Sequence, residues 1–520
     1  MRCCGLPWNA KSPVGVVFVF GLAGLACTSV TDVDSSGGGG SGGGAGTAGG
    51  PASGGAGRGG APGQDGPWWG GAGGDPGAGG TGAGGTGAGG SGTTPGVDAR
   101  PSDAAPPPNA VLAACPWTGS KAYQTASDMV YEPQQVVRFD LEIKANDLQA
   151  LLTRDQEIFV PAAVSFCGVR LDGAGVRFRK SSLAIRRGLP FAPDPKNPKL
   201  FSKKNPILID VNELVPASNQ KLFGLRKINF EYGNDQLLIA ERMNWELLRA
   251  FGLNVSRVNS ANLYVNGEYW GLFTSTERVD RSFAAYHYGN DTGNLYKHQY
   301  CGTYSWLGSN QSAYKTECYA LKTNELVADY SDLVHLVDVI NNSKDLKTEL
   351  PKVLNVTEWI KQAAALQSLA YGDSLATNGN NSYAYHSSNP DRFEFTPWDM
   401  DGGYWWPGQP CERMADTINR GLFAISKCFT SVPVFQKVVA VADWRVEFLR
   451  AARGFTDGPF SPAKFVASVD ALVKFLGPHL ATDPNRSGTD AQWKMQIDSL
   501  KVLQQRRYEA VNGQLKALGY

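Results

Sequence analysis

A long run of glycine, serine, alanine, threonine and proline divides this chain of 520 residues into two unlike parts. The run extends from Ser35 to about Pro108 and contains almost no larger aliphatic side chain. Such a segment cannot bury enough apolar surface to offset the conformational entropy lost on ordering. We therefore predict a disordered, flexible tether over residues 27–109. The folded part is confined to residues 110–520, which are enough for a large core, most simply in two lobes.

The N-terminal segment has the pattern of an export signal. Positive charge at Arg2 and Lys11 accompanies an apolar run, residues 14–26, that is too short to cross a bilayer as a stable helix. Small residues then lead to Cys27, which resembles the lipidated cysteine of a bacterial lipoprotein. We predict a lipoprotein-type signal peptide over residues 1–26 and an exported protein held at a membrane through lipidated Cys27. Ordinary secretory cleavage nearby is the alternative.

Charge and motif content exclude several classes of function. The formal net charge of +1 gives no electrostatic reason to expect nucleic acid as a partner. The folded part contains neither the G-x-S-x-G motif nor the H-E-x-x-H motif, which disfavours the hydrolases that these motifs mark.

The cysteines of the folded part indicate disulfides rather than a metal site. Their even number suits an oxidising compartment, and the histidines are scattered without ligand spacing. Local spacing favours the pairs Cys301/Cys318 and Cys411/Cys428, which leaves Cys115/Cys167.

Residues 371–403 carry the side chains that suggest chemistry. Asp373 is followed five residues later by Asn378. Two runs of alternating polarity, SYAYH and RFEFTPW, are joined by SSNPD and predict a β-hairpin. Since a hairpin returns the chain to where it started, we expect Asp399 and Asp401 to lie beside the loop that carries Asp373.

This order of oxygen-bearing side chains suits phosphoryl transfer. Mg²⁺ prefers oxygen ligands, and the attacking hydroxyl needs a carboxylate to orient and deprotonate it. A protein-kinase catalytic loop spaces its base and its metal-binding asparagine as D-x-x-x-x-N and reaches a second metal-binding aspartate after a hairpin. The structural alternative is that Asp373 caps a turn and Asp399 ends a strand.

The remaining patterns predict strands before this stretch and helices around and after it. Before it we expect a strand at 136–143, a helix at 145–154, strands within 164–188 and 201–214, a helix ended by Gly252, and a hairpin over 261–280 with Asn266-Gly267 at its turn. After Trp406, helical patterns continue to the C-terminus, and both Arg506 and Arg507 are expected to be solvated. A helix over 356–372 leads directly into Asp373.

Several of these motifs together resemble the spore-coat CotH kinase family. They are LLIAERMNWELLRAFGLNVSRVNSANLYVNGEYWGLFTSTERVD, GNLYK at 293–297, the D-x-x-x-x-N-x-x-N loop and the P-W-D-x-D end of the hairpin. The resemblance covers about residues 135–405. It implies an α+β, bilobal, atypical protein-kinase-like fold with a strand-rich N-lobe (about 110–280) and a helical C-lobe (about 281–520). It also implies ATP and Mg²⁺ as cofactors and Ser/Thr-bearing proteins as substrates.

Carried onto this chain, the resemblance assigns a role to individual residues. Asp373 matches the catalytic aspartate, and the metal ligands would be Asn378, Asp399 and Asp401. The cofactor-binding residues would be Lys204 for phosphate, Glu241 to orient that lysine, and Glu277 to Val279 beside adenine.

Some positions leave alternatives open. Asn205 can also occupy the lysine position, and Lys203, Lys180 and Arg177 are rivals to Lys204. Glu241 can instead be a solvated charge on a helix surface, and Glu277 and Val279 a plain strand end.

Besides the ambiguous lysine position, the sequence departs from the usual family pattern at two residues. Asn380 stands where a histidine is common, and Lys180 stands where a glycine is usual in the phosphate-side turn. Since ATP is scarce outside the cytoplasm, the alternative functions are a non-catalytic nucleotide-binding module and a structural or adhesive surface lipoprotein.

Overall fold

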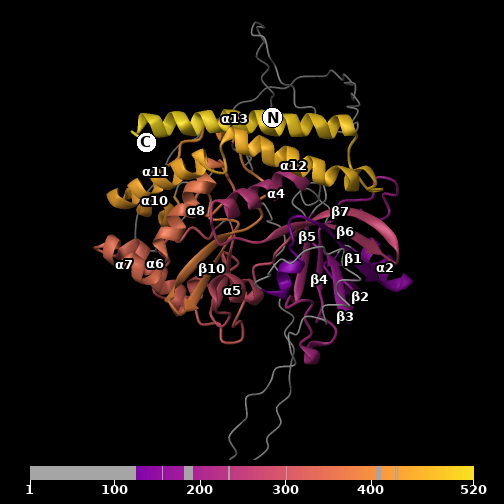
Figure 1. Cartoon of the computed structure of the whole chain (residues 1–520). Helices are drawn as coiled ribbons and strands as arrows, with labels where there is room; N and C mark the ends of the chain where they lie inside the picture. Colours follow the sequence, from indigo (N-terminus) through magenta and orange to yellow (C-terminus); the bar gives the residue numbers. More distant parts are fainter. Residues whose placement is uncertain are drawn as a thin grey trace, which may run out of the picture. The chain divides into compact units, whose positions relative to one another are not determined.

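The computed structural model describes residues 125–520, except 155, 181–190, 232–234, 300, 406–411, 428 and 430. The predicted signal peptide, the tether and Cys27 lie outside the described residues. Within the described part, a closed barrel and a four-stranded sheet are combined with helices (Figure 1). This confirms the mixed α+β class.

Seven strands form the barrel, in the order β1-β2-β3-β4-β5-β7-β6. β1 and β6 pair in parallel and close the barrel, while the other neighbours are antiparallel. Aromatic rings fill the interior, where Phe139 stacks on Phe166 with centroids 4.5 Å apart. The strands are β1 (Val136–Glu142), β2 (Val160–Phe166), β3 (Val169–Phe178), β4 (Ile207–Asp210), β5 (Lys227–Glu231), β6 (Val258–Val265) and β7 (Glu268–Thr276).

Local sequence signals set the boundaries in this half as predicted. Asn266 and Gly267 have φ of 50° and 78°, as the tight turn between β6 and β7 requires. α4 (Asp235–Ala250) ends just before Gly252, whose φ is 80°. The Leu253 N–H then returns to the Leu248 carbonyl at 3.1 Å and closes the helix end. α2 (Ala145–Thr153) is the other predicted helix.

The second sheet has the order β11-β10-β8-β9. Its strands are β8 (Asn294–His298), β9 (Tyr319–Leu321), β10 (Ser382–Ser388) and β11 (Asp391–Pro397). The register of β10 and β11 runs from Ser382 opposite Pro397 to Ser388 opposite Asp391, which confirms the predicted hairpin.

The cysteine predictions are confirmed where the structure describes them. Cys301, shortly after β8, and Cys318, just before β9, form a disulfide. Cys167 is also disulfide-bonded. Its expected partner Cys115, like Cys411 and Cys428, lies outside the described residues.

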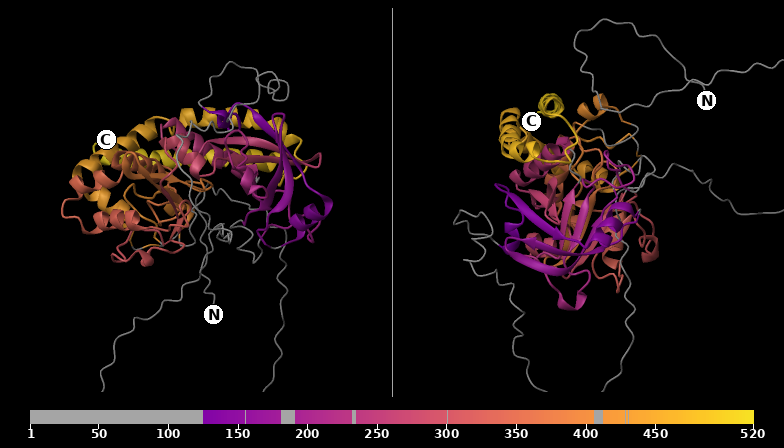
Figure 2. Two further views of the ribbon diagram at one scale, coloured as in Figure 1. Left: turned by 90° about the horizontal axis from the view of Figure 1, so that it is seen from below. Right: turned by 90° about the vertical axis from the view of Figure 1, so that its right-hand side faces the viewer.

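Helices make up most of the chain after residue 330. They are α6 (Ser331–Asn342), α7 (Leu346–Val353), α8 (Val356–Ser368), α9 (Met414–Ile418), α10 (Pro433–Ala440), α11 (Ala442–Asp457), α12 (Pro462–Ala481) and α13 (Asp490–Ala517), while α5 (Arg281–Tyr288) precedes β8. α12 and α13 lie side by side, and both pack on α4 (Figures 1 and 2). None of the helices in the described part of the chain has the length and apolarity needed to cross a membrane.

The prediction for Arg506 is confirmed and that for Arg507 is wrong. Arg506 is exposed, but Arg507 is fully buried in α13. Its guanidinium donates to the carbonyls of Gln367 and Ser368, in the last turn of α8, and to those of Ile418 and Arg420, at distances of 2.7–3.0 Å. Burial, and then repulsion from Arg420, lowers its pKa to about 9. The cation thus supplies donors to carbonyls at the C-terminus of α8, where positive charge is favoured.

Candidate functional site

The loop that carries Asp373 is closed by its own hydrogen bonds. α8 ends at Ser368, short of the predicted end at residue 372, and in the loop that follows it the Thr377 hydroxyl donates to the Gly372 carbonyl at 2.9 Å. The Asn378 N–H donates to the Ser374 carbonyl, also at 2.9 Å. The loop is therefore a compact turn attached to a packed helix, which favours a fixed position for its side chains.

Three asparagine amides hold the Asp373 carboxylate. Asn378 and Asn380 donate to its Oδ1 at 2.6 and 2.9 Å. Asn381 donates to Oδ2 at 3.2 Å. Gly379, between them, has a φ of 72°, and an added Cβ would lie 2.9 Å from the Thr303 side chain. The sequence N-G-N-N therefore builds a clamp that fixes the orientation of the carboxylate.

The hairpin brings Asp399 back to this loop, as expected. The Trp398 N–H donates to the Asn381 carbonyl at 2.8 Å, one position beyond the last pair of the β10–β11 ladder. The hydroxyl of Tyr371 donates to the Asp399 carbonyl. Asp399 has a φ of 58°, an uncommon conformation for a residue other than glycine, and such strain is concentrated at functional sites.

Five carboxylates influence one another here. Burial, followed by the charges of Glu231 and Asp373, raises the pKa of Asp399 to about 7. Burial likewise raises the pKa of Asp401 well above its usual value, with further contributions from Asp399 and Glu241. Asp399 and Asp401 both keep partial access to solvent. The clustered carboxylates repel one another when they are ionised, and a cation bound between them relieves that repulsion. This acidic cluster therefore suits a divalent ion.

The residues present suit a Mg²⁺ ion that also takes water and phosphate ligands better than a metal ion held by protein ligands alone. Among the described residues, no group of three His, Cys, Asp or Glu side chains is arranged to hold a metal ion. Mg²⁺ usually takes one or two carboxylates and completes its shell with water and phosphate oxygens. The predicted set of Asn378, Asp399 and Asp401 supplies two carboxylates and one amide oxygen, which agrees with that mode.

We expect Mg²⁺ to stabilise the protein more strongly as the pH rises through about 7. The folded-state pKa of Asp399 lies above its unfolded value of 3.8, so the metal-free protein loses stability as the pH rises between these values. A metal ion replaces the lost proton only once the carboxylate ionises. Thermal unfolding with and without MgCl₂ at about pH 5.5 and about pH 8.5 tests this. Equal stabilisation at both pH values would contradict it.

Glu241 belongs to the acidic cluster rather than to the solvated surface of α4. Its side chain is buried and accepts hydrogen bonds from Trp245 and Thr276, at 3.4 and 3.3 Å. Burial, followed by the charges of Glu231 and Asp399, raises its pKa well above the usual value. Asn244, also on α4, donates to the carbonyls of Met400 and Gly402. The helix is thus fastened to the segment that carries Asp399 and Asp401.

The structure does not pair Lys204 with Glu241. The Lys204 ammonium donates to the Asp483 carboxylate at 2.7 Å and to the Leu272 carbonyl, and both charged side chains are buried. Two of the alternative candidates for the phosphate-binding cation also form ion pairs away from Glu241. Lys203 pairs with Glu268, and Arg177 pairs with Glu157. Lys180 is exposed, and Asn205 bonds to nearby backbone.

Two other cations face the carboxylates. Arg179, at the end of β3, donates to Glu231 and Asn229, both at 2.7 Å, and its charge lowers the pKa of Asp399. Lys297 also acts on Asp399, while burial, followed by repulsion from Arg179, lowers its own pKa to about 8. Sequence reasoning missed both. The available signals were the position of Lys297 as the last residue of the GNLYK motif and the basic run around Arg179.

Glu277 and Val279 lie in the connection between β7 and α5. The Glu277 carboxylate is buried between Arg257 and His287. Burial opposes its ionisation, but these two partners outweigh burial and lower its pKa to about 2. Val279 packs in a separate apolar cluster with Phe283, Leu295, Tyr383 and Trp398. The Glu277 side chain is therefore engaged in a structural ion pair directly after the end of β7.

Comparison with known proteins gives one family. A family model described as CotH kinase protein matches residues 200–511, which is the main part of the chain. No curated protein matches. A search of solved structures finds the crystal structure of a Helicobacter pylori proinflammatory kinase, CtkA, at 10% identity and a TM-score of 0.29, covering 56% of this chain and 92% of that one.

Proposed function

This chain belongs to the CotH kinase protein family, and on that basis we propose that it transfers the γ-phosphate of ATP to serine or threonine hydroxyls of proteins, with Mg²⁺ as the metal. The observation that supports this most is the convergence of Asp373, clamped by three amides, with the carboxylates of Asp399 and Asp401. We further propose that the barrel and the helical part correspond to the two lobes of a kinase-like fold.

Each residue at the site has a distinct task in this reaction. Asp373 orients the substrate hydroxyl and accepts its proton as the oxygen attacks the γ-phosphorus and the bond to ADP breaks. Asn378, Asp399 and Asp401 would hold Mg²⁺, which would neutralise charge on the phosphate oxygens. Arg179 and Lys297, whose charges act on Asp399, supply the positive charge that triphosphate oxygens need nearby.

The decisive experiment measures transfer from ATP labelled at the γ-phosphate to a mixed pool of exported proteins. We expect labelled phosphoserine or phosphothreonine that requires Mg²⁺ and disappears with EDTA. Nucleotide-dependent thermal stabilisation without transfer would instead support a nucleotide-binding module. Absence of both at millimolar nucleotide and Mg²⁺ would support a structural or adhesive role.

Replacing Lys297 by methionine is expected to raise the KM for ATP by about 10–100-fold, because a charge-assisted hydrogen bond contributes about 1.5–3 kcal/mol. Steady-state kinetics at saturating protein substrate measure the change. Lys203→Met is the matched control, because this lysine pairs with Glu268 and should leave KM unchanged. A larger effect in the control than at Lys297 would contradict the assignment.

Location is a separate proposal. We propose that the protein is exported and anchored through lipidated Cys27. Cys27→Ala should move the protein from the membrane fraction to the soluble fraction, whereas unchanged fractionation would exclude this anchor.

A further inference from the structure

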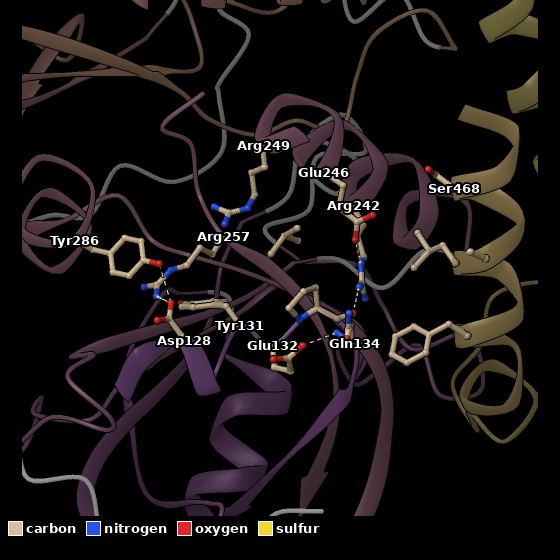
Figure 3. A pocket seen from close by; sticks show the side chains of 15 residues that line it. Asp128, Tyr131, Glu132, Gln134, Arg242, Glu246, Arg249, Arg257, Tyr286 and Ser468 are labelled. Carbon is tan, nitrogen blue, oxygen red and sulfur yellow. Dashed lines mark hydrogen bonds and ion pairs between the residues drawn. The ribbon is translucent and has the colours of Figure 1, made fainter. Parts of the chain in front are cut away.

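A cavity of about 880 Å³ lies where a short 3₁₀ helix, η1 (Ala126–Met129), meets α4 and α12 (Figure 3). Charged side chains that line it pair with one another. Arg257 donates to Asp128 at 2.7 Å, and Arg242 donates to Glu246 at 2.7 Å. Positive and negative charges therefore balance there, and the cavity indicates no charged ligand.

A buried histidine of the second sheet, by contrast, is directly connected to the loop that carries Asp373. His298 is the last residue of β8 and is fully buried. In the ladder it stands opposite Ser382, the first residue of β10. Ser382 directly follows Asn381, whose amide donates to the Asp373 carboxylate at 3.2 Å. His298 therefore lies beside the end of the N-G-N-N clamp.

Both ring nitrogens of His298 have a partner. Nδ1 lies 2.7 Å from the Ser382 hydroxyl, and Nε2 lies 2.7 Å from the Tyr304 hydroxyl. Burial lowers the pKa of His298 to about 3, so at neutral pH the ring is uncharged, with one nitrogen donating and the other accepting. Because the imidazole is held at both nitrogens, it offers the Ser382 hydroxyl a partner of fixed position.

Residues 301–304 pack against the middle of the clamp. A Cβ added to Gly379 would lie 2.9 Å from the Thr303 side chain and 3.1 Å from the Gly302 backbone. A Cβ added to Gly302 would in turn lie 2.7 Å from the Cys318 carbonyl oxygen. Because these contacts leave no room for a further methyl group, the clamp and residues 301–304 are already as close as their backbones allow.

Residues 301–304 are themselves attached to other elements. A disulfide joins Cys301 to Cys318, which directly precedes β9. The Tyr304 carbonyl accepts from the Asn341 amide of α6 at 2.8 Å. These attachments do not involve the clamp, so the segment is held in place by β9 and α6 and can serve as a fixed support.

We propose that His298 is a positioning residue for Asp373, which holds Ser382 and with it the asparagine clamp that orients the carboxylate. The imidazole is buried away from any substrate. It acts only through Ser382 and the neighbouring Asn381. The effect on rate rests on the proposed phosphate transfer, whereas the effect on the order of the loop can be measured without it.

Replacing Ser382 by alanine removes the hydroxyl that His298 holds, and we expect kcat to fall by about 10–100-fold, as for a small misplacement of a reacting group. Ser387→Ala is the matched control, because this serine is also buried in β10 but lies towards the other end of the strand. It should retain the kcat of the unmodified protein.

A double variant separates positioning from a general loss of structure. In Asp373→Asn protein, Ser382→Ala should lower the remaining rate by less than about threefold, since both changes act on one group. A purely structural role would lower the rate by the same factor in both backgrounds, and that result would contradict the proposal.

Hydrogen exchange followed by mass spectrometry gives a readout that needs no activity. Ser382→Ala should speed exchange in peptides that cover residues 374–381 by about 2–10-fold, the factor expected for loss of one hydrogen bond, and Ser387→Ala should not. His298→Asn, whose amide takes the place of Nδ1, should protect these peptides better than His298→Leu. The serine variants decide the matter if the histidine variants do not fold.

The proposal is overturned if Ser382→Ala matches Ser387→Ala in the exchange of residues 374–381, or if folded His298→Leu matches His298→Asn. If the unmodified protein transfers no phosphate, the proposed function fails, and the exchange comparison alone decides the role of His298.

Discussion

Replacing Asp373 by asparagine is expected to lower the rate of phosphate transfer by about 10²–10⁴-fold, the usual contribution of a positioned general base. The substitution keeps the size and one acceptor oxygen of the side chain, so the amides of Asn378 and Asn380 retain a partner. Only the capacity to take a proton from the substrate hydroxyl is lost. The loss should therefore lie in kcat, with nucleotide binding nearly unchanged.

The matched control lies at the other end of the same hairpin. Asp391 is the first residue of β11, directly after the hairpin turn, and its side chain is 83% exposed. Asp391→Asn should retain transfer within about twofold of the unmodified protein, as surface substitutions usually do. If Asp373→Asn were as active as Asp391→Asn, Asp373 would not be the base, whatever its place in the loop.

Local chemistry made the hairpin and the loop predictable from sequence. The turn residues, the alternating runs and the spacing from Asp373 to Asn378 all lie within one stretch of chain. The ladder between β10 and β11 then fixes by geometry where Asp399 returns. The same holds for the Asn266-Gly267 turn and the helix end at Gly252, because a left-handed backbone conformation is encoded by the residue itself.

Partners far along the chain could not be predicted in this way. Lys204 was preferred as the phosphate-binding lysine, but its ammonium pairs with Asp483, 279 residues away. Arg179 and Lys297 reach the carboxylates only because β3 of the barrel and β8 of the second sheet both approach them. Charge alone does not reveal such choices, since any lysine or arginine can pair with either a carboxylate or a phosphate.

Replacing Arg507 by leucine is expected to lower the free energy of unfolding by about 3–5 kcal/mol, as large as any single substitution usually achieves. The guanidinium serves four backbone carbonyls, among them those of Gln367 and Ser368 at the end of α8. Leucine fills similar space but offers no donor. The Gln367 and Arg420 carbonyls keep second donors, the Ala370 N–H and the Gln514 amide, whereas those of Ser368 and Ile418 lose the donor that Arg507 supplies. Each carbonyl left buried and unpaired costs about 1–3 kcal/mol, and removal of a desolvated charge offsets only part of the sum.

Urea unfolding measured by circular dichroism gives the comparison. Arg506→Leu changes the adjacent, exposed arginine in the same helix and should alter stability by less than about 0.5 kcal/mol. Arg507→Lys keeps the charge, but a compact ammonium cannot reach four carbonyls in one plane, so we expect an intermediate loss. Equal stability of Arg507→Leu and Arg506→Leu would show that these carbonyls find other donors. Because α8 leads directly into the loop of Asp373, the leucine variant should also lose transfer activity at temperatures below its unfolding transition, and Arg506→Leu should not.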